Sequence, residues 1–179
     1  MNRQQGWSRF EWLITVSAIG IVLLFAVERY LDMAREGRRM GFELLANHFT
    51  AGVALTRANW LINRVNPEQF FVQIDGQFVY MSEQGWPMST EPVAEKSEPE
   101  KAPVFCRQLW DSLLQNPQQA TVEGVSEWGQ RRYHISSPHQ GVCRYELVAE
   151  PRGSNFFDYD LRTGQVSVTT PAANQVSSL

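Results

Sequence analysis

The sequence contains little of what catalysis, metal binding or nucleic-acid binding requires. Of its 179 residues only three are histidines and two are cysteines, and the formal net charge is −3. It has no Gly-x-Ser-x-Gly elbow, no Gly-x-x-x-x-Gly-Lys loop and no His-Glu-x-x-His pair. No basic patch with interleaved aromatic residues is present, which argues against a nucleic-acid partner. We therefore expect a protein that is not an enzyme, has no catalytic residues and binds no cofactor or metal.

Apolar residues are instead abundant near the N-terminus. Residues 12–27 carry no charge, and Glu11 and a short polar leader that ends in Gly6 precede them. This run is slightly shorter than a membrane span and reaches about twenty residues when counted from Trp7. An ionisable side chain in a membrane is expensive and commonly functional, so Glu11 is a candidate site residue. If the chain were cleaved after Gly6, the new amino group of Trp7 would lie one helical turn from this carboxylate.

The two cysteines, Cys106 and Cys143, cannot complete a zinc shell without paired histidines. An even number of cysteines in a chain with an export signal is typical of one disulfide in an oxidising compartment. Two buried free thiols are the alternative. A disulfide that closes a loop of this length would contribute about 3–4 kcal/mol in the chain-entropy model.

The leader, Glu11 and the apolar run together resemble the class III leader of type IV pilins and type II secretion pseudopilins. The resemblance implies that residues 1–6 are the leader, that prepilin peptidase cleaves between Gly6 and Trp7, and that Glu11 docks the subunit against the N-terminal amine of a neighbour. An ordinary signal anchor with a boundary glutamate is the alternative. Three residues depart from the family pattern and fit a minor subunit better than a major one: Trp7, Arg9 and Glu28.

The helix is expected to continue beyond the membrane. Residues 7–28 would be its transmembrane, filament-core half and residues 29–66 an amphipathic half, because apolar side chains recur there at three- and four-residue steps. Breaker residues and Pro67 would end the helix, and Gly37, Gly41 and Gly52 would weaken it. Four arginines and three acidic residues interleave between positions 28 and 39 and predict a solvated face with ion pairs. The predicted apolar stripe consists of Leu31, Ala34, Phe42, Leu45, Phe49, Val53 and Trp60.

Residues 67–179 are expected to form a globular antiparallel β domain that covers this stripe. Asp75-Gly76 between two β-rich runs is a strong hairpin signal. Residues 89–103, rich in Glu, Lys, Pro and Ser, predict a mobile loop, and Ser136-Ser137 before Pro138 predicts a turn. The predicted class is α+β, a long N-terminal helix packed on a small antiparallel sheet with one short extra helix. The expected strands are 70–74, 77–81, 130–135, 142–149, 155–161 and 165–169, and the expected short helix is 104–114.

Several segments resemble the MSHA (mannose-sensitive haemagglutinin) group of type IV pilins. The likeness is carried by residues 34–62, Gly85-Trp86-Pro87, the short helix that begins at Cys106, and residues 156–168. It implies a type IV pilin fold and a minor pilin that inserts in the inner membrane, with its C-terminal domain in the periplasm. Such a subunit takes part in pilus assembly or initiation, or sits at the tip of the extracellular pilus, and supports surface attachment. The implied partners are other major and minor pilin subunits, prepilin peptidase and the inner-membrane assembly platform, with methylation of the new N-terminus.

Two other functions fit the same residues. An uncleaved, membrane-anchored periplasmic accessory protein of a pilus or secretion system is favoured by the departures at Trp7, Arg9 and Glu28. A glycan-binding module at a filament tip is favoured by the loop at 89–103 and by four tryptophans, which otherwise fill a small core. Those tryptophans are Trp60, Trp86, Trp110 and Trp128. Asp158 and Asp160 alternate with aromatic residues and are expected on the solvent face of a strand, where a calcium site is an alternative to simple solvation.

Overall fold

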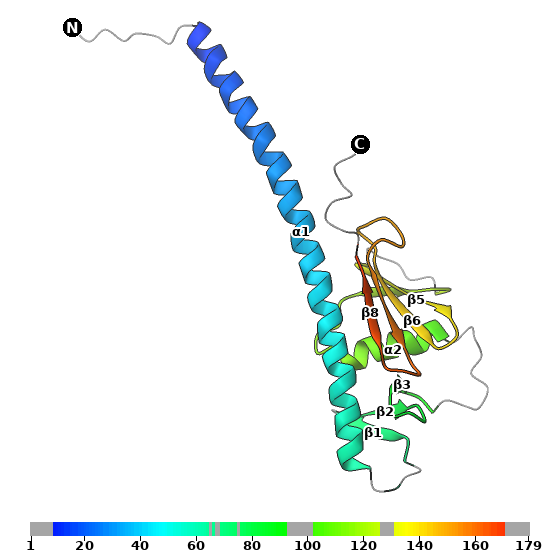
Figure 1. The fold of residues 1–179 in the computed structure, drawn as a ribbon. Coiled ribbons are helices and arrows are strands. Elements are labelled where there is room, and N and C mark those ends of the chain that lie inside the picture. The colour runs from blue at the N-terminus through cyan, green and yellow to red at the C-terminus, as the bar shows by residue number, and fades with distance from the viewer. Residues whose placement is uncertain are drawn as a thin grey trace. The chain divides into compact units, whose positions relative to one another are not determined.

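The computed structural model in Figure 1 describes residues 9–64, 66, 69–74, 76–92, 102–125 and 131–170. The chain divides into two units, residues 1–41 and 42–179. The predicted α+β class is confirmed: a long N-terminal helix is followed by antiparallel sheets and one short extra helix. The elements are α1 (Arg9–Asn63), β1 (Phe71–Ile74), β2 (Gln77–Met81), β3 (Pro87–Ser89), α2 (Ala102–Leu113), β4 (Ala120–Val122), β5 (Tyr133–His139), β6 (Val142–Leu147), β7 (Phe156–Asp160) and β8 (Val166–Thr169).

Helix α1 ends at Asn63, close to the predicted end, and the amide of Arg64 closes its last turn by donating to the carbonyl of Trp60 (3.0 Å). The predicted apolar stripe is buried only in the second unit. Leu31 is 49% exposed, whereas Phe42 is 1% exposed. Successive steps of four and three residues place the buried side chains on one helix face. They are Phe42, Ala46, Phe49, Val53, Thr56 and Trp60.

The larger sheet of the second unit has the strand order β4-β5-β6-β7-β8. Neighbouring strands are antiparallel except β4 and β5, which are parallel. Strand β4 was not predicted, because three residues carry almost no periodic signal. The predicted turn at Ser136-Ser137 is wrong, since both residues lie in β5. A register shift between Ser136 and His139 accommodates Pro138, which has no amide to donate to the ladder.

The smaller sheet has the order β1-β2-β3. Its first hairpin is the predicted one, and Gly76 at the turn has a φ of 82°. The other residue of that predicted turn, Asp75, lies outside the described residues. The predicted loop at 89–103 is too long at both ends, because Ser89 belongs to β3 and Ala102 begins α2. The short β3 is a strand because it pairs with β2. Residues 93–101 lie outside the described residues.

The main core of the second unit is an aromatic cluster between α1, α2 and the larger sheet. The ring centroid of Phe49 lies 5.0 Å from Tyr145, 5.4 Å from Phe157 and 5.4 Å from Tyr159. Such ring pairs contribute about 0.5–1.5 kcal/mol each beyond their buried area. The α1 stripe is therefore covered by inward-facing aromatic side chains of β6 and β7, as the need for a second layer predicts.

Close contacts at glycines join elements of the second unit, and those at Gly52 and Gly164 bear on the packing of α1, α2 and the larger sheet. A Cβ built on Gly52 would lie 2.5 Å from the carbonyl oxygen of Leu113, so α1 and the end of α2 approach closely there. Gly164, in the β7–β8 turn, has a φ of 70°, and a Cβ on it would overlap the ring of Trp86. The guanidinium of Arg57 lies 3.6 Å from the centroid of that ring. Both glycines are thus required by packing, and Gly164 by its backbone conformation as well.

Candidate membrane anchor and docking segment

The N-terminal part of α1 is long and apolar enough to cross a membrane. None of its most apolar 18-residue window is buried within the structure. Between Phe10 and Val27 twelve large apolar side chains, on all sides of the helix, are 46–71% exposed. A helix that is apolar all round is typical of a membrane span or of a helix buried among others. A signal sequence near an N-terminus meets the same criteria of length and composition.

Glu11 lies in the first described turn of α1. It is the only ionisable residue between Arg9 and Glu28 in the sequence. The positive end of the helix dipole favours a carboxylate in this position. The hydroxyl of Thr15, one turn along, donates to the backbone carbonyl of Glu11 rather than to its carboxylate. The predicted cleavage residues, Gly6 and Trp7, lie outside the described residues, so cleavage between them stays a prediction.

A charged segment follows the apolar one. The guanidinium of Arg35 and the carboxylate of Asp32 form an ion pair of 3.6 Å, and both side chains are more than half exposed. An exposed pair of this kind contributes little to stability. The interleaved charges thus form a solvated helix face, as predicted, and would suit the water-facing side of a membrane boundary.

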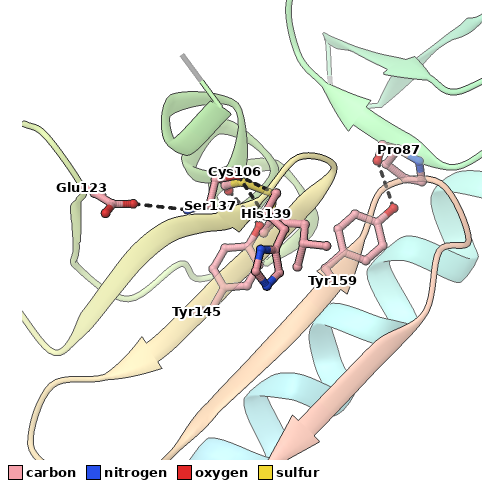
Figure 2. Close-up of a disulfide and its surroundings, with 9 residues drawn as sticks. Pro87, Cys106, Glu123, Ser137, His139, Tyr145 and Tyr159 are labelled. Atoms are coloured by element: carbon pink, nitrogen blue, oxygen red, sulfur yellow. Dashed lines mark hydrogen bonds between the residues drawn. A yellow bond between two sulfur atoms is a disulfide. The ribbon is translucent and has the colours of Figure 1, made fainter. Parts of the chain in front are cut away.

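The disulfide between Cys106 and Cys143 joins α2 to β6 in the second unit. Both cysteines are buried, with Cα atoms 5.4 Å apart. The hydroxyl of Tyr145 donates to the backbone carbonyl of Cys106 (2.9 Å), next to the disulfide (Figure 2). Burial raises the pKa of the Tyr145 phenol well above its usual value. The pairing expected from the even cysteine count is therefore present, and it joins the short helix to the middle of the larger sheet.

A second tyrosine joins the two sheets. The hydroxyl of Tyr159 in β7 donates to the carbonyl of Pro87 in β3 (2.9 Å), and Figure 2 shows the phenol ring directed at that proline. Burial again raises the pKa of this phenol, and the charge of the neighbouring Asp160 raises it further. Sequence reasoning missed this contact, because the two residues are 72 positions apart.

The candidate calcium ligands have other partners. Asp158 accepts two hydrogen bonds of 2.8 Å from the guanidinium of Arg144, which is 3.8 Å from the ring centroid of Phe156. Asp160 accepts hydrogen bonds from the amides in the β7–β8 turn. Burial alone would raise the pKa of Asp160, but these donors outweigh it and lower the pKa. Over the described ranges no three His, Cys, Asp or Glu side chains are grouped to hold a metal ion.

The histidines are scattered over the second unit. His48 is exposed on α1 and His139 is exposed at the end of β5. Nδ1 of His134 lies 3.0 Å from the hydroxyl of Thr121, which links the parallel strands β4 and β5. Within the part of the chain that the structure describes, no hydrogen bond joins two of the three histidines.

The chain matches no family model, no curated protein and no solved structure. Its layout is nevertheless a definite one: a long apolar N-terminal helix, antiparallel sheets packed on the later part of that helix, and a disulfide. This layout is consistent with a pilin-like architecture. The apolar segment fits membrane anchoring.

Proposed function

We propose that this protein is a minor type IV pilin of the MSHA type. In this proposal the apolar part of α1 first lies in the inner membrane and then packs among the corresponding helices of other subunits. The observation that supports it best is one uninterrupted helix, apolar and exposed at its start, that ends within a disulfide-bonded β domain. The role is structural and not enzymatic, and it needs no cofactor.

The exposed side chains of the apolar segment need a non-aqueous environment. Burial of one large apolar side chain contributes about 1.5–3 kcal/mol, so twelve such side chains favour lipid or helix contacts strongly over water. Lipid and a bundle of apolar helices are similar in polarity. A subunit can therefore leave the membrane for a filament without exposing this surface to water.

In this proposal Glu11 makes the docking of one subunit against its neighbour selective. A carboxylate among apolar side chains is costly unless it is paired. Cleavage between Gly6 and Trp7 by prepilin peptidase would create an amino group that can form an ion pair with Glu11 of a neighbouring subunit. The disulfide supports an oxidising location, the periplasm, for the second unit.

Removal of residues 1–6 is the first test. Intact-mass analysis of the protein purified from its native cells should show the loss of this hexapeptide and one methyl group on Trp7. Gly6→Leu should preserve the leader, while Gly20→Ala, a glycine substitution within the apolar run, should be processed normally. A native protein that keeps its first six residues would support the uncleaved anchor instead.

Assembly is the second test. Glu11→Ala and Glu11→Gln should reduce the number of surface pili, or the amount of this subunit in sheared pili, with processing intact. Glu28→Ala at the other end of the apolar run is the matched control and should assemble normally. Normal piliation of both Glu11 variants, together with normal processing of Gly6→Leu, would refute the proposal.

A further inference from the structure

Strand β1 has one backbone edge that no strand covers in the described part of the chain. The smaller sheet has the order β1-β2-β3, so β1 lies at its edge and pairs with β2 alone. In an antiparallel pair, hydrogen-bonded and non-hydrogen-bonded residue pairs alternate. The amide of Met81 donates to the carbonyl of Phe70 (2.7 Å), which fixes this alternation. The backbone amides and carbonyls of Phe71 and Gln73 are therefore directed away from β2.

A pocket of about 240 Å³ lies beside this edge in the second unit. Three consecutive residues of β1, Phe71 to Gln73, line it together with the end of α1, and none of its nine described lining residues belongs to β3. The side-chain amide of Gln69, which also lines the pocket, donates to the carbonyl of Phe71 (3.4 Å). This long hydrogen bond takes the place that the amide of a neighbouring strand would have. The free edge of β1 thus opens on the pocket.

The α1 side of the pocket can satisfy a second row of backbone groups. An extended segment paired with β1 would carry further amides and carbonyls on its far edge, and burying these without partners is costly. Asn63 and Asn59 line the pocket, and the side-chain amide of Asn63 donates to the side-chain oxygen of Asn59. Over the described ranges, this leaves the Asn63 oxygen and the Asn59 side-chain N–H groups for other partners. One acceptor and one donor group are what one edge residue of a strand needs.

Arg64 gives the pocket a positive charge. Its guanidinium lies 4.8 Å from the ring centroid of Trp60 and forms no ion pair within the part of the chain that the structure describes. None of the nine described lining residues is acidic. Trp60 packs in the smaller core with Val72, so the guanidinium lies on the side of the sheet that Val72 faces. A carboxylate on that side of a bound segment would complement it.

The opposite face of β1 is apolar. Phe71 is 39% and Phe78 is 45% exposed, and their ring centroids lie 5.6 Å apart. Antiparallel register places both rings on the face away from Val72. The side chains of an added strand alternate between the same two faces, so successive residues would meet the rings, the guanidinium and the rings again. The sequence that complements this edge is therefore apolar, acidic, apolar.

We propose that the edge of β1 binds an extended segment of a partner protein, with the pattern apolar–acidic–apolar, as an added antiparallel strand. The backbone groups of its two apolar residues bond to those of Phe71 and Gln73, and its carboxylate pairs with Arg64. Strand addition of this kind is a general mode of peptide recognition. The occupant is a single segment and not the sheet edge of a second copy, because the end of α1 forms the far wall of the pocket. The site uses none of the residues proposed for processing or docking, so the inference goes beyond filament assembly.

Short blocked peptides test the proposal. The probe is acetyl-Thr-Val-Glu-Val-Thr-amide, titrated into the full chain in detergent and followed by saturation-transfer NMR, with empty micelles as the blank. Saturable binding with a Kd on the order of 0.1–1 mM is expected for a segment of this size. The same peptide with Lys in place of Glu should bind at least about tenfold more weakly. N-methylation of both Val residues, which removes the two amide donors that face β1, should weaken binding to at least the same extent.

Two substitutions at one position separate recognition of the backbone from recognition of the side chain. Gln73→Pro removes the outward N–H but no hydrogen bond to β2, since proline is tolerated where the N–H of an edge strand faces outward. It should weaken binding at least about tenfold. Gln73→Ala keeps that N–H and should bind as the unaltered chain does. Arg64→Glu should reverse the charge preference, so that the Lys peptide binds more tightly than the Glu peptide. Near-UV circular dichroism checks the fold of each variant.

Amide hydrogen exchange observes the edge directly. At saturating peptide, exchange of the Phe71 and Gln73 amides should slow at least about tenfold, whereas the amide of Val72, which is already bonded to β2, should change little. Protection of the two outward amides without peptide, rising with protein concentration, would indicate pairing with a second copy and overturn the proposal. Equal binding by Gln73→Pro and Gln73→Ala, or equal binding of the Glu and Lys peptides, would do the same. So would the absence of saturable binding up to about 10 mM, some ten times the highest expected Kd.

Discussion

Substitution of Gly52 tests how closely α1 and α2 approach. In an exposed helix interior, replacing glycine by alanine stabilises by about 1 kcal/mol through helix propensity. Here the new Cβ would lie 2.5 Å from the carbonyl oxygen and 3.2 Å from the Cβ of Leu113. Ordinary contacts begin at 3.4 Å, so the two helices would have to separate by about 0.9 Å (3.4 − 2.5). Forced overpacking of a core costs about 1–3 kcal/mol.

The two effects oppose each other, and packing should win. We expect Gly52→Ala to lower the free energy of unfolding by up to about 2 kcal/mol, once the propensity gain of about 1 kcal/mol is subtracted from the packing cost. Urea unfolding of the full chain in detergent, followed by tryptophan fluorescence, measures this change. The ring of Trp110, which is fully buried in the main core, reports loss of that core.

Two controls isolate the packing contribution. Ala51→Gly, at the neighbouring exposed position, measures propensity alone and should cost about 1 kcal/mol. Gly41→Ala has open space around its new Cβ and should be neutral or stabilising. If Gly52→Ala instead stabilises the protein by as much as Ala51→Gly destabilises it, propensity alone governs the site, and the close approach inferred from Leu113 is wrong.

Three further measurements test the second unit. Replacing Cys106 and Cys143 together by alanine should lower the unfolding free energy by about 4 kcal/mol, because the disulfide closes a 37-residue separation; a loss under about 1 kcal/mol in urea unfolding would contradict this. The stability contributed by the Tyr159 phenol should be full well below pH 10 and should be lost progressively as the pH rises through 10 and above, because the unfolded chain releases this proton there while burial holds the pKa of the phenol higher in the folded state. Tyr159→Phe should flatten that fall by up to about 1.4 kcal/mol per pH unit, and an unchanged slope in pH-dependent unfolding would contradict the assignment. Gly164→Ala should destabilise by about 1–3 kcal/mol through overlap with the Trp86 ring, and Trp86→Leu in the same chain should recover part of the loss in a double-mutant cycle.

Much of the fold could be predicted from local patterns. The long helix follows from apolar periodicity, and the first hairpin from a glycine between two β-rich runs. Gly76 has the positive φ that such a turn needs. The disulfide followed from the cysteine count and the export signal that the sequence predicts, although the count alone left free thiols open. These predictions succeeded because each depends on residues close together in the chain or on a single possible pair.

The errors share a physical cause. Strands β3 and β4 are three residues long and exist through pairing with β2 and β5, which no local pattern reveals. Pro138 was interpreted as a turn signal, but a register shift lets β5 continue past it. Gly52 was interpreted as a weak point of the helix, whereas the carbonyl of Leu113 makes it a point of close packing.

The sequence by itself determined that an apolar helix with one acidic residue near its start precedes a β domain, since hydropathy, charge and periodicity are properties of neighbouring residues. Only the tertiary structure decided which part of that helix is covered, how Tyr159 joins two sheets, and that amides and rings from α1 and the first hairpin surround one pocket. Those features depend on distances between segments far apart in the chain. Such distances are fixed by packing and not by composition.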